Sequence, residues 1–545
     1  MDCLFIPLSS LPRPGPDHGP LSLTLIKVAC VALLASLPSV PSAAATTAVC
    51  GKCHQAETAR YLATPMGKSL IAPEDLPPGK INHEPSHSVI TTEERNGTMI
   101  HTLTEEGLTA EYPVRYQIGG GLMGSSFLIQ IKDYLFESPA SWFNSYGWDI
   151  SPGYALAPLI DFDRPMNATC FFCHASNVRF SDADERRLRT PNLSAIGCER
   201  CHGSSEEHLR RPAAKNIVNP AKLSGPARDS ICEQCHLEAA GRVLNPGKRW
   251  EDFHPGAPAE QTFATYMLVG GDNHEVIAVS QVEQLAQSMC MRASGGKLWC
   301  GTCHNPHGQV KDRQQELRTI CTNCHVKLAA DHPAAPTECT SCHMPRGPTT
   351  NVAHAALTDH RILRRPGNPA LQQSGPEKVV AWREPPLPVQ ERNLALADLL
   401  AALSEKSSAL QEEGFRLLTS VPAEHWNNDP EAVSALEGLY LQKGDFANAI
   451  KFGQRSIALS PHSAKAAMNF ALVLLRSRDP AAAESQFGRA IDLDPSLKPA
   501  YGRLAIMYAN QGRSAEMMDV IDRYLKWNPQ DIMFRMQKRR HTQNQ

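Results

Sequence analysis

Hydrophobic positions in the last third of the chain recur every 34 residues. Three series of residues keep this interval: Leu436, Phe470 and Leu504; Tyr440, Leu474 and Tyr508; and Pro461, Pro495 and Pro529. Such a period is typical of stacked helix pairs, each too small to bury its apolar side alone. Residues 393–426 predict a degenerate first repeat and residues 532–540 a capping helix. We therefore expect residues 393–545 to form an α-helical solenoid.

A different pattern occupies the first half of the chain. Apolar and polar residues alternate over residues 87–103, on both sides of the dipeptide Asn96-Gly97, and again over residues 126–136. Alternation predicts half-buried strands, and Asn-Gly is a typical hairpin turn. The sequence thus predicts a small β-rich insertion in a chain that is otherwise mainly α.

The N-terminus resembles a secretory leader. Lys27 precedes the apolar run 28–37, and small residues follow at positions 42–45. This arrangement predicts a signal peptide over residues 1–44. The run is too short to span a bilayer and no other segment comes close, so we expect no transmembrane segment after signal cleavage. The expected location is periplasmic or otherwise exported.

Prolines divide the rest of the chain. Residues 364–392 are rich in proline, which predicts a stiff linker. On this division residues 45–363 form one domain and residues 393–545 the helical repeats. Residues 45–363 also differ from the linker and the repeats in their chemistry, because only they contain the cysteine motif that is described next.

The pentapeptide Cys-x-x-Cys-His occurs seven times in this region. The copies are Cys50, Cys53 and His54; Cys170, Cys173 and His174; Cys198, Cys201 and His202; Cys232, Cys235 and His236; Cys300, Cys303 and His304; Cys321, Cys324 and His325; and Cys339, Cys342 and His343. This is the attachment motif of c-type haem, in which both thiols bind the porphyrin and the histidine binds iron. We therefore expect seven covalently bound haem c groups.

Zinc sites and thiol redox pairs also use Cys-x-x-Cys, but they do not require a histidine next in sequence. All seven pairs carry that histidine. Fourteen of the 17 cysteines belong to the motifs, and Cys3 and Cys30 fall in the predicted leader. Cys290 remains, and we interpret it as a small buried hydrophobe.

The second axial ligand decides what each iron can do. A second histidine closes the iron and favours electron transfer, whereas a vacant position permits ligand binding. Ten further histidines lie in the same region. Our candidate ligands are His83, His208, His274, His307, His332, His354 and His360, with His87, His101 and His254 in reserve. Met66 is an alternative thioether ligand.

The net charge of the chain limits which class of macromolecule it is expected to bind. The formal net charge is −2, from 54 basic and 56 acidic residues. This balance argues against a nucleic-acid partner. A redox partner protein is expected instead, docking on the repeats or at exposed haem edges.

The chain resembles bacterial tetratricopeptide-repeat multihaem c-type cytochromes. Its haem part is similar to the tetrahaem cytochromes associated with hydroxylamine oxidoreductase. The likeness is carried by the first, third, fifth and seventh motifs with the residues that follow them, and by the segment 358–362. It implies stacked haem pairs, mostly with two histidine ligands, and it agrees with His208, His307 and His360 as ligands. No Cys-x-x-Cys-Lys motif is present, which argues against a pentahaem nitrite reductase.

Two functions remain open on the sequence. One is a periplasmic electron carrier with a chain of bis-histidine haems, whose repeats dock a protein partner. The other is a multihaem oxidoreductase that acts on a small nitrogen or sulfur compound at one open haem. The surplus of histidines favours the carrier. Electron transfer alone is not catalysis, so the sequence favours a protein that is not an enzyme.

Overall fold

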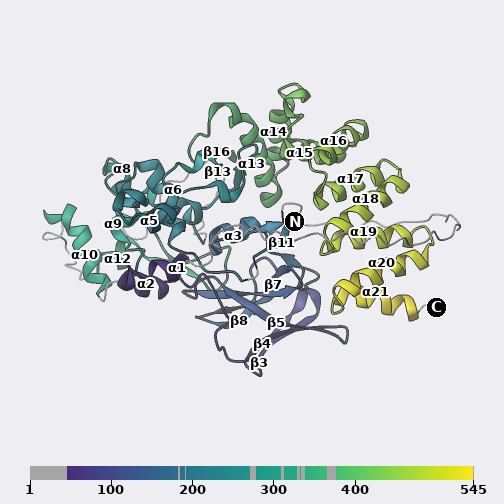
Figure 1. Ribbon diagram of the computed structural model, residues 1–545, viewed down its shortest axis with the longest axis horizontal. Helices are drawn as coiled ribbons and strands as arrows, with labels where there is room; N and C mark the ends of the chain where they lie inside the picture. The colour runs from purple at the N-terminus through teal and green to yellow at the C-terminus, as the bar shows by residue number, and fades with distance from the viewer. Residues whose placement is uncertain are drawn as a thin grey trace, which may run out of the picture.

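The computed structural model describes residues 46–181, 184–190, 192–270, 278–308, 312–327, 332, 338–364 and 376–543. The predicted signal peptide and His274 lie outside these residues. A β-sheet, a region of short helices and a long row of paired helices follow one another along the chain (Figure 1). Among the described residues, no helix is both long enough and apolar enough to cross a membrane.

The β-rich insertion is a nine-stranded antiparallel sheet. Its central order is β2-β3-β4-β5-β6-β7-β8, with β1 paired to β5 and β9 paired to β7. The strands are β1 (Leu70–Ile71), β2 (Gly79–His83), β3 (Ser88–Arg95), β4 (Thr98–Glu105), β5 (Leu108–Ile118), β6 (Gly124–Ile131), β7 (Tyr134–Phe143), β8 (Gly147–Ile150) and β9 (Arg164–Pro165).

The predicted hairpin at Asn96-Gly97 is confirmed. Both residues have positive φ, 52° and 76°, and they join β3 to β4 in a two-residue turn. The insertion is larger than expected, however, so "mainly α" describes only part of the fold. Strand β7 was missed because nearly all of its residues are buried, and a strand covered on both faces does not alternate.

Short helices carry the seven motifs. They are α1 (Thr46–Cys50), α3 (Ala168–His174), α4 (Glu199–His202), α6 (Gly225–His236), α9 (Cys300–Cys303), α10 (Arg313–Cys324) and α12 (Cys339–His343). Between them lie α2 (Gln55–Leu62), α5 (Glu206–Arg210), α7 (Gln281–Gln287) and α8 (Met289–Ala293), with the strand pairs β10 (Phe180–Ser181) with β11 (Asp184–Leu188) and β14 (Arg346–Pro348) with β15 (Ala356–Thr358).

The proline-rich segment is not a free linker over its described part. Residues 378–381 form β16, which pairs with β13 (Phe263–Val269), and β13 pairs with β12 (Gly241–Leu244). The next two side chains bind the helical region: Trp382 Nε1 donates to Glu233 Oε1 at 3.1 Å, and Arg383 binds both Glu233 and Glu260. Proline content alone does not reveal these long-range contacts.

The C-terminal row consists of helix pairs, as the 34-residue period predicts. The helices are α13 (Gln390–Glu405), α14 (Ser408–Thr419), α15 (Pro430–Gln442), α16 (Phe446–Leu459), α17 (Ala464–Arg476), α18 (Pro480–Leu493), α19 (Lys498–Ala509), α20 (Ser514–Trp527) and α21 (Ile532–Gln543). Small residues allow the close packing. Ala449 and Ala483 are fully buried, and a Cβ at Gly453 would lie 2.2 Å from the Phe470 ring.

Both ends of this row pack against the rest of the chain. At one end α13 covers the sheet β12-β13-β16, where Arg392 donates to Leu244 O at 2.6 Å and Asn393 to Asn245 Oδ1 at 2.8 Å. At the other end Trp527 packs edge-on against Tyr134 of the large sheet, at 5.8 Å between ring centroids. The last helices and the sheet share one hydrophobic core.

A buried ion cluster stabilises the contact between the last helices and the large sheet. Lys498 Nζ lies 2.9 Å from Asp161, 3.1 Å from Asp163 and 2.8 Å from Asp531. Burial alone would lower the pKa of Lys498, but the three carboxylates hold it well above its usual value. The lysine is therefore charged, and its charge compensates acidic groups from both sides of the contact.

Replacing Lys498 by alanine is expected to lower the free energy of unfolding by about 3–5 kcal/mol, because the buried carboxylates lose their compensating charge. Denaturant unfolding of the full-length protein, followed by circular dichroism, measures this. Lys465→Ala is the matched control, since Lys465 is exposed in the first turn of α17. Its effect should stay within about 0.5 kcal/mol. Equal effects of the two variants would contradict the account.

Candidate haem-binding sites

Each motif occupies roughly one helical turn. In four copies the histidine amide donates to the carbonyl of the first cysteine at 2.9–3.0 Å: His54 to Cys50, His202 to Cys198, His304 to Cys300 and His325 to Cys321. This bond places the two thiols and the imidazole on neighbouring positions of one turn. The local geometry suits attachment of one ring by two thioethers, with the histidine beneath it.

All seven motifs line one connected cavity of about 5010 Å³. Both cysteines of six motifs, Cys339 of the seventh and all seven motif histidines contribute to its walls. Shared among seven groups, the cavity offers roughly 700 Å³ each, within the roughly 300–1,000 Å³ typical of sites for small molecules and cofactors. In volume and in donor chemistry, the described residues therefore fit seven haem groups.

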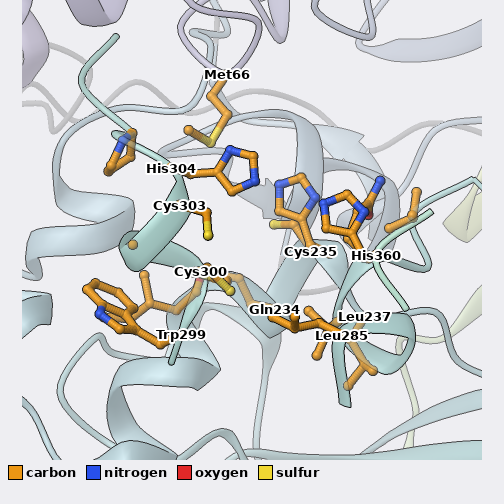
Figure 2. Close-up of a pocket in the computed structure, with 18 of the residues that line it drawn as sticks. Met66, Gln234, Cys235, Leu237, Leu285, Trp299, Cys300, Cys303, His304 and His360 are labelled. Atoms are coloured by element: carbon orange, nitrogen blue, oxygen red, sulfur yellow. The ribbon is translucent and has the colours of Figure 1, made fainter. Parts of the chain in front are cut away.

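Four motif histidines face a second histidine across this cavity. The ring centroids are 6.3 Å apart for His54 and His208, 5.8 Å for His202 and His307, 6.2 Å for His304 and His360, and 6.1 Å for His332 and His343. In the first three pairs the ring planes lie within 25° of parallel. Figure 2 shows His304 and His360 with the sulfur atoms of Cys235, Cys300 and Cys303 around them.

These separations match two imidazoles on one metal ion. A metal–imidazole bond is about 2 Å long and the ring centroid lies roughly 1.2 Å behind the nitrogen, so two axial rings have centroids about 6.4 Å apart. Parallel rings in direct contact lie closer, as Tyr146 on His354 shows at 3.9 Å. Each of the three near-parallel pairs thus leaves the space of one coordinated iron between its rings. The rings of His332 and His343 have the same separation but are nearly perpendicular.

Backbone carbonyls orient one ring of each pair through Nδ1. His202 Nδ1 lies 2.8 Å from Val218 O, His208 Nδ1 3.1 Å from Ala213 O, His343 Nδ1 2.6 Å from Leu363 O and His360 Nδ1 2.8 Å from Thr358 O. A proton on Nδ1 leaves the Nε2 lone pair for a metal, the usual arrangement of ligating histidines.

Burial favours the neutral form, which binds metal, in three of these rings. Desolvation lowers the pKa of His304 to about 4, with a further contribution from the nearby Arg313 guanidinium. Burial likewise lowers the pKa values of His307 and His360. No protonation step at neutral pH competes with coordination at these positions.

Two candidate ligands from the sequence lie elsewhere. His83 is buried in β2, where Nδ1 contacts Ser86 Oγ at 2.7 Å and Nε2 contacts Ala155 O at 3.2 Å. His354 Nε2 binds Asp149 at 2.6 Å, and its ring stacks on Tyr146. Neither lines the cavity, so the structure does not support them as ligands.

The reserve histidines also lie away from the cavity. His101 is fully buried in the sheet between Phe127 and Trp148, and desolvation lowers its pKa to about 3. His87 is exposed at the start of β3, and His254 is exposed as well. His101 contacts Ser138 Oγ through Nδ1 at 2.7 Å, and the other two are solvated. Spacing along the chain could not distinguish these positions from ligands.

Three motif histidines, His174, His236 and His325, form no ring pair with a second imidazole among the described residues. Burial lowers the pKa values of His174 and His236. Met66 lines the cavity, and Ser69 beside it donates to His174 O at 2.9 Å. The Gln281 side chain contacts the His236 imidazole, a neighbour that the sequence analysis did not single out.

Thiols of different motifs approach one another. Four pairs are within side-chain hydrogen-bonding reach: Cys50 with Cys198, Cys173 with Cys235, Cys232 with Cys300, and Cys321 with Cys339. Cys201 also lies near Cys232, and Cys303 near Cys321. Every motif therefore has at least one neighbour, and the seven form a continuous series. Cys290 lines the same cavity, where burial raises the pKa of its thiol.

Comparison with known proteins agrees with this chemistry. The family of cytochrome c554 and c-prime matches residues 156–203, and the doubled CXXCH motif family matches residues 292–330. The multihaem cytochrome MtrA of Shewanella baltica (strain OS185) is 24% identical over 176 residues, 29% of this chain and 52% of that protein. These matches support a multihaem c-type cytochrome with covalently bound haem c. The matched region spans about half the length of this curated relative.

Solved structures resemble the helical repeats. The crystal structure of MamA is 19% identical with a TM-score of 0.23, covering 26% of this chain and 80% of that chain. The crystal structure of YrrB, a TPR protein with an unusual peptide-binding site, is 15% identical with a TM-score of 0.23, covering 28% and 73%. The repeat fold of the present chain rests on its own helix pairs and their 34-residue period.

Removing the second imidazole of a histidine pair should leave one haem iron without its second axial ligand. His208→Ala, His307→Ala and His360→Ala are each expected to convert one low-spin haem to high-spin, because the axial nitrogen is lost. Electron paramagnetic resonance of the oxidised protein measures the change.

His83→Ala and His354→Ala are the matched controls, and neither should alter the spin states. A high-spin signal from a control variant, or none from the three paired positions, would show that the ring pairs do not mark the axial ligands.

Proposed function

We propose that this protein is an exported electron carrier in which seven haem c groups form one conducting series. The four histidine pairs are the observation that carries the proposal, since iron with two imidazole ligands has no position free for substrate and exchanges electrons instead. When bound, the haem groups supply one-electron chemistry. The protein positions them through the motif thiols and the paired imidazoles.

The contacts between motifs support a defined route. The first motif neighbours the third (Cys50 with Cys198), the third the fourth (Cys201 with Cys232) and the fourth the fifth (Cys232 with Cys300). The fifth leads to the sixth and seventh, and the second joins at the fourth through Cys173 and Cys235. Electrons entering at any motif can therefore reach every other.

Solvent-exposed thiols indicate where electrons enter and leave. Cys53 of the first motif, Cys324 of the sixth and Cys342 of the seventh are exposed, whereas the other motif cysteines are half-buried. We assign these three motifs as the places where a redox partner protein approaches. The predicted leader supports an extracytoplasmic location.

The helical repeats have a structural role in this proposal. They hold the sheet at one end and the strands beside the fourth motif at the other, through Trp527 and Arg392 respectively. Docking of a partner on the repeats stays a prediction, as does the link to hydroxylamine oxidoreductase. Deleting residues 393–545 would expose the core around Tyr134, so truncation does not isolate a docking role.

The second candidate function is an oxidoreductase. His174, His236 and His325 have no paired imidazole among the described residues, and an iron with one histidine ligand can bind a small nitrogen or sulfur compound. Electron carriage and catalysis at a single open iron are compatible, because the remaining haems would deliver the electrons.

A spectroelectrochemical titration of the purified holoprotein tests the carrier function. We expect all seven haems to be reduced and reoxidised reversibly, mostly at low potential, because two imidazole ligands give lower potentials than a methionine–histidine pair. His307→Met should raise the potential of one couple, and His87→Met, at an exposed position outside the cavity, should raise none. Haems that stay oxidised at low potential, or a majority at high potential, would contradict the proposal.

A further inference from the structure

Two arginine side chains lie between the second and the fourth motif. Arg242 Nη1 lies 3.8 Å from Cys173 Sγ, one of the two thiols of the second motif. The Arg200 guanidinium lies over the ring of Phe172 in the same motif, 4.4 Å from the ring centroid, and donates to the Phe172 carbonyl. Both arginines line the shared cavity, so their charges lie at the branch where the second motif joins the fourth.

Backbone carbonyls at the end of α6 hold Arg242 in this position. Its Nη1 atom donates to Gln234 O at 2.8 Å, and its Nη2 atom donates to Leu237 O at 2.6 Å and to Glu233 O at 3.2 Å. Helix α6 carries the fourth motif and ends at His236, so these bonds satisfy carbonyls at its C-terminus. The positive charge is therefore fixed between the two motifs.

These two charges have no carboxylate partner in direct contact. Neither arginine forms an ion pair among the described residues, and the Nε atom of each is buried there without a hydrogen-bond partner. Other half-buried arginines of the haem region are paired. Arg228 binds Asp229 at 2.8 Å, and Arg313 binds Glu316 at 2.6 Å. A charge that is shielded from water and left unpaired acts more strongly on its surroundings than an exposed one.

The acidic groups on this part of the wall are Glu238 and Glu283, which form no ion pair with Arg242 in the described part of the chain. Burial raises the pKa of Glu283 to about 8, so at neutral pH this carboxyl group compensates little of the guanidinium charge.

A fixed positive charge at this place favours a reduced haem. Reduction adds one electron to iron(III) and gives iron(II), so the charge of the haem falls by one. A positive charge nearby then stabilises the reduced form relative to the oxidised form and raises the reduction potential. Unit charges about 10 Å apart, at an effective dielectric constant of about 20, change an equilibrium constant roughly tenfold.

We propose that Arg242, together with Arg200, raises the reduction potentials of the haems at the second and fourth motifs, so that electrons in the series collect at this branch. The proposal rests on the haem attachment and the carrier function proposed above. The redox partner protein of that function supplies the electrons. Arg242 acts through its charge and is not an iron ligand.

A spectroelectrochemical titration of the full-length holoprotein tests this with Arg242→Gln and Arg242→Lys. Arg242→Gln removes the charge but keeps a side-chain donor for the carbonyls. We expect one or two of the haem couples to move to lower potential, with a roughly tenfold smaller equilibrium constant for reduction, which is about 59 mV for one electron. Arg242→Lys keeps the charge but loses the forked bonds, and it should retain the wild-type potentials.

Arg346→Gln is the matched control. Arg346 lines the same cavity and donates to Ala356 O at 2.9 Å, but it is exposed, so water and salt screen its charge. Its removal should shift no couple by a comparable amount. Intact mass of each variant establishes that its haem content is unchanged. Arg200→Gln should lower the same couples, and it replaces Arg242→Gln as the test if that variant attaches fewer haems.

Two results would overturn the proposal. One is a charge-removing variant with full haem content whose couples coincide with those of the wild type. The other is an equal shift in Arg242→Gln and Arg242→Lys, which would make the bonds to the carbonyls, and not the charge, responsible. Failure of the carrier function is a separate outcome, because it would appear in the wild-type protein as haems that are not reduced and reoxidised reversibly.

Discussion

Four of the seven motif helices bury no side chain of their own, and the rest of the structure depends on this. Helices α4, α9, α10 and α12 carry four motifs, yet none of their described side chains is buried. Their cysteines and histidines instead surround a cavity of about 5010 Å³. Small units without an apolar core need another source of stability, such as covalent links or metal. In the function that we propose, haem groups would fill the cavity between these helices and hold them through the motif cysteines and histidines.

The large sheet and the helical repeats pack against each other outside the cavity that the motifs line. Buried aromatic residues fill the interface between them, as Tyr112, Tyr134 and Trp527 show, and Lys498 compensates carboxylates from both sides. At the other end Arg392 binds Asp429 within the repeats and Leu244 O beside the fourth motif. The row of helices is thus fixed at both ends, to the large sheet and to the strands that follow the fourth motif.

Local patterns predicted the parts that depend on local interactions. The Asn96-Gly97 turn and the 34-residue repeat could be predicted because turn geometry and helix pairing depend on residues that lie close together in the sequence. The ligand pairs depend on tertiary contacts. His208 follows His202 by six residues, yet it faces His54, and His202 faces His307. Spacing likewise does not reveal that Ser86 contacts His83 and that Asp149 binds His354.

We propose above all that seven haem groups fill the cavity that the seven motifs line. The intact mass of the mature protein, purified from a host that attaches haem c, tests it most directly. We expect a mass that exceeds the polypeptide by seven haem groups in a folded protein. Six or fewer haems in fully matured protein, or a stably folded protein that carries none, would contradict it.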